Sequence, residues 1–308
     1  MLRIGLLAAA TRALAEEPGV PVKYCQRRGE ERRSGLKREL YPNEVPAAIT
    51  PHAEQAAITV EDIITHPDYN ASHSAFVHIV KDLMAGTSFH SSVHILRPLL
   101  SLTCSRHHGQ CVYLEIGSFC GASMALALSY PRIDRTVSVS HPHFRVANTP
   151  VGPLYAETVK CLNLYRANHT QLPMLSGLAH HATKVALDGY KVDVLLIDGN
   201  HDYGAVLQDF DKYAVFVRPG GAILMDDYGG GKEVPGVKQA VTKLTRSKAF
   251  CTEKYHCLGQ LPNLAGADST CAYQPDFWRK FLAIPAGGSV CPQQPAPRLN
   301  NEYVLIKR

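Results

Sequence analysis

Three carboxylates follow two apolar segments in the second half of the chain. Asp198 ends the run 192–197 (VDVLLI), and Asp226 and Asp227 end the run 222–225 (AILM). Ligands of open α/β sheets bind beyond the carboxyl ends of the strands, so we expect these side chains to meet at one edge. Three carboxylates repel one another unless a hard divalent cation binds them through oxygen. A single Asp here could instead cap the following helix, but the set of three favours a metal site, with Mg²⁺ as the expected ion.

A second motif lies earlier, over residues 112–123 (VYLEIGSFCGAS). An apolar run ends in Glu115-Ile116-Gly117, and Gly121 opens the next expected helix. Glycines allow a sharp turn and the close approach of a ligand, and a helix N-terminus presents free N–H groups. Alone, this turn can be purely structural. The Gly-x-Gly-x-x-Gly pattern of dinucleotide-binding folds is incomplete, which counts against an enzyme that uses NAD or a nucleotide.

Together these motifs resemble the class I S-adenosylmethionine-dependent methyltransferases. The segments IDGNHDY, RPGGAILMDDY and 235–241 (PGVKQAV) are similar to the metal-dependent sugar O-methyltransferases of the macrocin and aminocoumarin type, also called methyltransferase domain 24. Cephalosporin-hydroxylase-like proteins share the pattern. The resemblance covers roughly residues 75–250 and the last strand.

The resemblance implies a role for each motif residue. It places the cation on Asp198, Asp226 and Asp227, with His201 as general base and Asp198 as its catalytic neighbour. S-adenosylmethionine would bind along a larger set of residues, namely Glu115, Gly117, Ser118, Gly121, Ser140, His141 and Asp198.

The end of the second expected strand departs from the family pattern. Residues 136–141 (TVSVSH) hold no carboxylate for the ribose hydroxyls of the cofactor, so Ser140 or His141 would have to bind them. A neutral donor or acceptor forms a weaker bond than a charged one. An alternative function is therefore a catalytically altered, methyltransferase-like binding protein. Among the other histidines, His141 and His143 rank next to His201 because they follow this strand.

Helix-like and strand-like segments alternate from residue 74 onward, which predicts a Rossmann-like α/β fold. We expect a seven-stranded, mostly parallel sheet with helices on both faces and an antiparallel last strand, 302–307, at its edge. The expected strands are 111–116, 136–140, 172–176, 192–197, 222–225 and 302–307. The expected helices are 74–85, 91–104, 120–130, 154–168, 180–187, 203–216 and 234–244.

Two regions fall outside this alternation. Residues 1–73 are expected to form a leader and a basic, poorly structured extension, and 257–298 a loop-rich insertion within the domain 74–308. Residues 23–38 carry seven basic and two acidic side chains. The net charge of this segment, +5, therefore equals that of the whole chain. We interpret this cluster as a solvated arm rather than a nucleic-acid surface, which should spread over a folded face.

The sequence is compatible with a cytoplasmic protein and, as the alternative, with a protein of an organelle or the secretory route. Residues 1–15 make a weak leader, and no segment is long and apolar enough to span a bilayer. Cys104, Cys111, Cys120 and Cys161 are expected as buried free thiols, whereas Cys251, Cys257, Cys271 and Cys291 fit no zinc pattern and could pair in an oxidising compartment. The sequons at Asn70 and Asn168 are compatible with that route.

The sequence therefore predicts a metal-assisted O-methyltransferase that acts on a hydroxyl of a small molecule. A metal that binds substrate oxygens lowers the pKa of a hydroxyl, and His201 would take its proton. We expect a small-molecule acceptor and no nucleic acid. The oligomeric state stays open, with a homo-oligomer among the options.

Overall fold

A computed structural model provides the coordinates. It describes residues 57–69, 95–106, 110–118, 121–128, 130, 132–141, 145–146, 149–150, 168–229, 235–262 and 299–308. The expected helices 74–85 and 154–168 lie outside these ranges, except that Asn168 begins a strand. His143, Cys120, Cys161, Cys271 and Cys291 also lie outside them.

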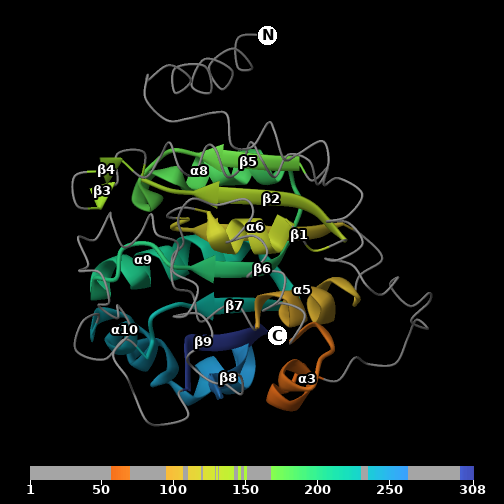
Figure 1. The fold of residues 1–308 in the computed structure, drawn as a ribbon. Coiled ribbons are helices and arrows are strands. Elements are labelled where there is room, and N and C mark those ends of the chain that lie inside the picture. Colours follow the sequence, from red (N-terminus) through yellow and green to blue (C-terminus); the bar gives the residue numbers. More distant parts are fainter. Residues whose placement is uncertain are drawn as a thin grey trace, which may run out of the picture.

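Seven strands form one sheet in the order β5-β2-β1-β6-β7-β9-β8 (Figure 1). The first five in this order run parallel, and β9 runs antiparallel to both of its neighbours. Their bounds are β1 Cys111–Ile116, β2 Ile133–Val139, β5 Asn168–Leu172, β6 Val192–Ile197, β7 Val217–Met225, β8 Tyr255–Pro262 and β9 Leu299–Lys307. A separate two-stranded ribbon pairs β3 Arg145–Val146 with β4 Thr149–Pro150. The expected fold class is confirmed.

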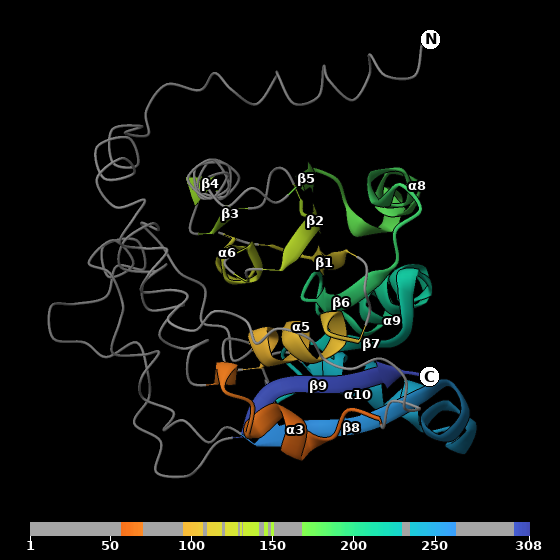
Figure 2. The ribbon, with the colours of Figure 1, turned by 90° about the vertical axis from the view of Figure 1, so that its right-hand side faces the viewer.

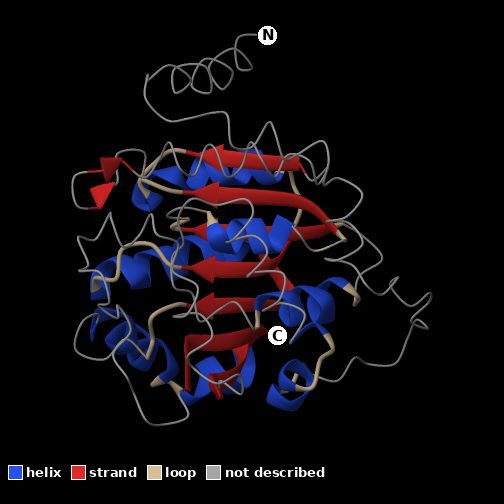
Figure 3. Ribbon diagram, viewed as in Figure 1, coloured by secondary structure: helices blue, strands red, loops and turns tan. Residues whose placement is uncertain are grey.

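Helices cover both faces of the sheet (Figures 2 and 3). On one face lie α3 Val60–Ile64, α5 Leu96–Cys104 and α6 Ala122–Leu128; on the other lie α8 Ser176–Leu187, α9 Tyr203–Tyr213 and α10 Pro235–Thr245. A 3₁₀ turn, η3 Ala214–Phe216, and a π turn, η4 Phe250–Lys254, follow α9 and α10. Every residue of β1 and β6 is buried, as expected for central parallel strands with helices on both sides. None of the described helices is long and apolar enough to cross a membrane.

The prediction that the last strand forms the edge of the sheet is wrong. β9 lies between β7 and β8, and β8 forms the edge. The insertion is expected from residue 257 onward because Pro, Gly and Gln interrupt the alternation there, and Gly259 and Pro262 of β8 are among these residues. The register shifts next to both residues, and Gly259 has a φ of +84°, so β8 is a bulged edge strand.

Residues before the expected boundary at residue 73 contribute to the core. Residues 57–69 form α3 and its flanks, and Ile58, Ile63 and Tyr69 are buried in the same core cluster as α5 and α6. The apolar residues of so short a helix do not show a clear period, so the sequence pattern missed it.

The observed bounds of β5 also differ from the expected ones. The sequence predicts this strand four residues later, at 172–176. The strand ends at Leu172, and Ser176 begins α8. β5 is the other edge strand, and His169, Thr170 and Gln171 are only partly buried. Its polar residues therefore hid it from a search for apolar runs.

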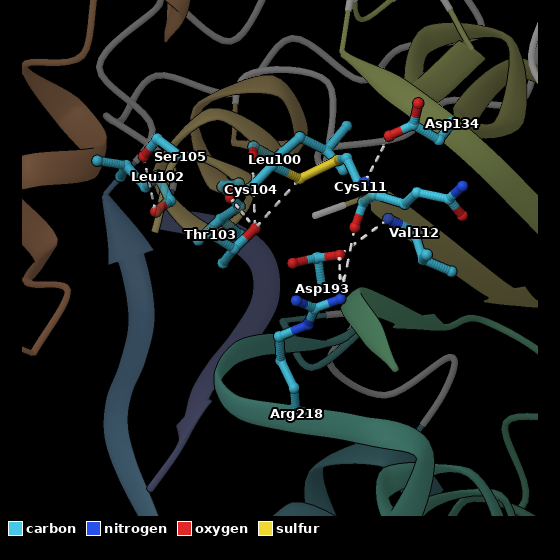
Figure 4. Close-up of a disulfide and its surroundings, with 12 residues drawn as sticks. Leu100, Leu102, Thr103, Cys104, Ser105, Cys111, Val112, Asp134, Asp193 and Arg218 are labelled. Carbon is cyan, nitrogen blue, oxygen red and sulfur yellow. Dashed lines mark hydrogen bonds and ion pairs between the residues drawn. A yellow bond between two sulfur atoms is a disulfide. The ribbon is translucent and has the colours of Figure 1, made fainter. Parts of the chain in front are cut away.

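The amino-terminal end of the sheet holds a disulfide and a buried ion pair (Figure 4). Cys104 at the end of α5 is bonded to Cys111 at the start of β1, so the prediction of free thiols at these two positions is wrong. Asp193 Oδ2 accepts the N–H of Val112 at 2.8 Å and lies 3.2 Å from Nη2 of Arg218. These contacts join α5, β1, β6 and β7 at the end opposite to the predicted site.

Candidate functional site

The predicted site residues lie in one row at the carboxyl edge of the sheet. Four backbone hydrogen bonds extend the ladder past the strand ends: Ser140 N–H to Leu172 O at 3.1 Å, Gly117 N–H to Val139 O at 2.8 Å, Asp198 N–H to Ile116 O at 2.8 Å and Asp226 N–H to Ile197 O at 3.0 Å. Ser140, Gly117, Asp198 and Asp226 are therefore the first residues after four neighbouring strands. The parallel topology explains why residues far apart in the sequence share this edge.

The turn after β1 has no room for a side chain at its first glycine. Gly117 has a φ of +88°, a left-handed conformation that favours glycine. A Cβ at this position would overlap the backbone carbonyl of Asp198. The turn after β1 and the loop after β6 are thus in direct backbone contact, which joins the expected cofactor segment to the expected metal segment.

Polar side chains lie buried around this turn. Glu115 is fully buried, and its Oε1 accepts a hydrogen bond from Ser123 Oγ in α6. The sequence analysis did not name Ser123 as a site residue, although its hydroxyl lies two residues after Gly121 on the helix that the turn opens. Ser118 is 1% exposed, and its Oγ has no hydrogen-bond partner among the described residues. Because buried polar atoms are nearly always satisfied, this hydroxyl fits contact with a polar ligand.

Two carboxylates and an imidazole gather after β6 and β7. His201 Nε2 lies 3.2 Å from Asp198 Oδ1 and 3.6 Å from Asp227 Oδ2. One ligand atom from each of these three residues lies within 4.8 Å of the other two, and all three side chains are partly exposed. This is the spacing that a single bound cation requires, and no other described group has it apart from the disulfide-bonded Cys104 and Cys111 with Asp193.

Asp226 differs from the other predicted ligands. Its side chain is 5% exposed, and its Oδ1 accepts the backbone N–H of Asp227 at 2.8 Å. Asp227 has a φ of +58°, so the backbone turns sharply between the two residues. The structure thus brings Asp198 and Asp227 together with His201, whereas Asp226 is not part of that group.

The loop that carries His201 rests on close backbone packing. A Cβ on Gly236, the second residue of α10, would overlap the carbonyl oxygen of His201. A Cβ on Gly199 would lie 3.2 Å from Oδ2 of Asp209, a buried residue of α9. Since interiors pack at crystal-like density, these contacts fix the path of residues 198–203.

The remaining predicted residues flank this centre. Ser140 is partly buried and belongs to the row at the edge, while His141 is exposed. His169, which the sequence analysis left aside, is bonded to Thr136 Oγ1 at 2.7 Å, and burial lowers its pKa to about 4. It is a structural residue of β5 and β2.

A comparison with known protein families identifies the segment that contains this site. Residues 114–228 match the model of a methyltransferase-domain family. These residues are a methyltransferase domain. The match spans Glu115, Asp198 and Asp227 alike, and it confirms the resemblance to methyltransferases noted in the sequence. Helix α10 and strands β8 and β9 follow the matched segment.

Individual proteins similar to the chain include one viral relative and several solved structures. The uncharacterized protein R132 of Acanthamoeba polyphaga mimivirus is 27% identical over 196 residues, which are 61% of this chain and 83% of that protein. The solved structures include CalS11, a TDP-rhamnose 3'-O-methyltransferase of calicheamicin biosynthesis, with 13% identity and a TM-score of 0.40 over 77% of this chain and 90% of that one. The mycinamycin methyltransferase MycE, in complex with Mg, has 19% identity and a TM-score of 0.37 over 68% of this chain and 62% of that one.

Proposed function

We propose that the methyltransferase domain transfers a methyl group to a hydroxyl of a small molecule, with the help of a divalent cation. The observation that carries this proposal is the backbone contact between Gly117 and Asp198. It places the turn expected to hold the methyl donor directly beside the cluster of Asp198, His201 and Asp227. A methyl donor and a group that takes up a proton would then share one edge of the sheet.

The residues of the turn suit S-adenosylmethionine. Among the described residues the hydroxyl of Ser118 has no partner, and it lies near the bonded pair of Ser123 and Glu115. These are polar groups that an aminocarboxypropyl chain can use. The cofactor would supply the methyl group from its sulfonium. Glycine at position 117 would let its backbone approach the ligand.

The second cluster suits a cation of the Mg²⁺ type. Asp198 and Asp227 offer carboxylate oxygens from two neighbouring loops, which is the ligand type that such ions use. A bound cation would lower the pKa of an acceptor hydroxyl. In this proposal His201 takes the hydroxyl proton at Nδ1, and Asp198 and Asp227, whose oxygens lie 3.2 and 3.6 Å from Nε2, stabilise the imidazolium that forms.

Calorimetric titration with S-adenosylhomocysteine, with and without Mg²⁺, tests the donor half of this proposal. We expect binding of S-adenosylhomocysteine in both conditions, because Asp198 is the only predicted cofactor contact that is also a predicted metal ligand. A protein that does not bind it would contradict the proposal. The protein could also bind S-adenosylhomocysteine but form none of it from S-adenosylmethionine with any member of a panel of sugars and vicinal diols. That result would favour the alternative of a binding protein.

Substitution of Asp198 tests the cation half. Asp198→Asn should weaken Mg²⁺ or Mn²⁺ binding by about tenfold or more, equivalent to about 1.4 kcal/mol, because it removes one of two charged ligands. His201→Ala should keep the ion and lose turnover. Asp202→Asn is the matched control, since Asp202 is exposed and makes no side-chain cap to α9. Equal metal affinities of the wild type and Asp198→Asn would exclude this site.

A further inference from the structure

The sequon Asn168-His169-Thr170 begins the outermost strand of the sheet, and its geometry suits a modified asparagine. The side chain of Asn168 is exposed and that of Thr170 is partly exposed. Alternate residues of a strand share a face, so Asn168 and Thr170 lie on one face of β5. His169 points to the other face, where it is bonded to Thr136. The side chains of the two residues that a glycan acceptor requires thus lie on the face opposite to the bond between His169 and Thr136.

The position of Asn168 keeps a large attached group away from the methyltransferase site. Asn168 is the first residue of β5 and pairs with Arg135 near the start of β2. The site lies at the opposite, carboxyl ends of the parallel strands, and β5 is an edge strand (Figure 1). A glycan at this place would extend into solvent without covering Gly117 or Asp198.

An independent observation concerns the redox state of the chain. Two disulfides, Cys104–Cys111 and Cys251–Cys257, link consecutive elements at two separate places, α5 to β1 and η4 to β8. Cys104 and Cys111 are each 2% exposed, so soluble reductants do not reach this bond in the folded protein. Disulfides form and persist in oxidising compartments such as the lumen of the endoplasmic reticulum, where asparagine glycosylation also takes place.

We propose that the chain matures in an oxidising secretory compartment and is N-glycosylated at Asn168. The co-reactant is a lipid-diphosphate-linked oligosaccharide. In the transfer, the bond between sugar C1 and the diphosphate oxygen breaks, and a bond between sugar C1 and the amide nitrogen of Asn168 forms. One amide proton is lost to the medium, and the lipid diphosphate leaves with the bonding electron pair. A host oligosaccharyltransferase catalyses the step, which requires the hydroxyl residue at position 170.

The experiment expresses the full chain, with its own N-terminus, in a eukaryotic cell. The purified protein is digested with peptide-N-glycosidase F in heavy-oxygen water. We expect the digestion to lower its apparent mass and to convert Asn168 to a labelled Asp that peptide mass spectrometry locates. Thr170→Val, which keeps the shape of the side chain, should abolish this label at Asn168. Thr170→Ser, which keeps a hydroxyl at the same position, should retain it.

A parallel measurement tests the redox part on the same sample. In denaturant, alkylation without prior reduction should leave Cys104, Cys111, Cys251 and Cys257 unlabelled, and alkylation after reduction in the same denaturant should label all four. The proposal would be overturned if the wild-type protein carried no label at Asn168. It would also be overturned if the four cysteines were alkylated before reduction. A label at Asn168 that survives Thr170→Val would show deamidation unrelated to glycosylation, which also overturns it. Each of these outcomes is independent of methyl transfer.

Discussion

At the scale of single residues, the glycine after β1 makes the firmest link between the two halves of the site. Gly117→Ala adds a Cβ that overlaps the carbonyl of Asp198 and imposes a side chain at a φ of +88°. We expect a loss of stability of about 2–4 kcal/mol from strain and overpacking together. Affinity for S-adenosylhomocysteine and for Mg²⁺ should fall together, because the displaced Asp198 belongs to the metal cluster.

Gly189 provides a matched control for this substitution. Its φ of +81° is almost the same, but a Cβ there meets no atom within 4 Å. Gly189→Ala should therefore cost only the backbone strain, about 1–2 kcal/mol, and leave both affinities unchanged. Calorimetry and urea denaturation of both variants measure the difference. Unaltered ligand affinities in a folded Gly117→Ala protein would place the cofactor elsewhere.

The buried carboxyl of Asp209 makes stability depend on pH. Burial raises its pKa to about 6, although Ser176 and Lys212 lower it. Since this folded-state pKa lies above the unfolded value of about 3.9, the stabilising contribution is complete below about pH 4 and is lost as the pH rises through 6. Asp209→Asn, which stays neutral, should gain about 2–3 kcal/mol relative to the wild type between pH 4 and pH 8.

Urea denaturation of both proteins at several pH values measures this gain. Asp211→Asn, at an exposed position on the same helix, is the control for the loss of a carboxylate from α9. If the difference for Asp209→Asn did not vary with pH, the pKa of Asp209 would be the same in the folded and unfolded states.

At the scale of elements, the Asp193–Arg218 pair holds the amino ends of β6 and β7. Asp193 is fully buried, and its pKa is raised to about 6 by burial, against the lowering effects of the Val112 N–H and Arg218. Arg218 also donates to the carbonyl of Lys191 at 2.9 Å. Removing Arg218 would leave a buried carboxylate without its counter-charge.

We expect Arg218→Ala to destabilise the protein by about 3 kcal/mol at pH 7.5. The loss should be smaller at pH 5, because a protonated Asp193 needs no counter-charge. The double variant Arg218→Ala with Asp193→Asn should recover part of the stability, and urea denaturation of the single and double variants measures it. A double variant less stable than Arg218→Ala would show that the charge of Asp193 is not the cause.

At the scale of the whole molecule, residues well before the matched methyltransferase segment complete its core. Ile63 of α3 is fully buried against the layer formed by α5 and α6, while its neighbour Ile64 is only partly buried. Ile63→Ala should cost about 2–4 kcal/mol, and Ile64→Ala about half of that or less. Thermal and urea unfolding of the two variants measure these values. Equal small losses would mean that α3 is not part of the cooperative unit.

The sequence alone determined the fold class and named the candidate site residues. The strands 111–116 and 192–197 were predicted with their observed bounds, because central parallel strands are apolar at every position. The turn residues after them follow from the same rule, since ligands bind at the carboxyl ends of such strands. Gly117 and Asp198 could therefore be named before any coordinates, and the family resemblance added Glu115 and His201.

Only the tertiary structure decided how those residues combine. It grouped Asp198 and Asp227 with His201 and set Asp226 apart, because the left-handed turn at Asp227 redirects one of two adjacent carboxylates. It also placed β9 inside the sheet, paired Cys104 with Cys111 and added Ser123 to the site. Sheet order, disulfide pairing and side-chain direction depend on contacts between distant segments, and a pattern of apolar and polar residues along one segment does not encode them.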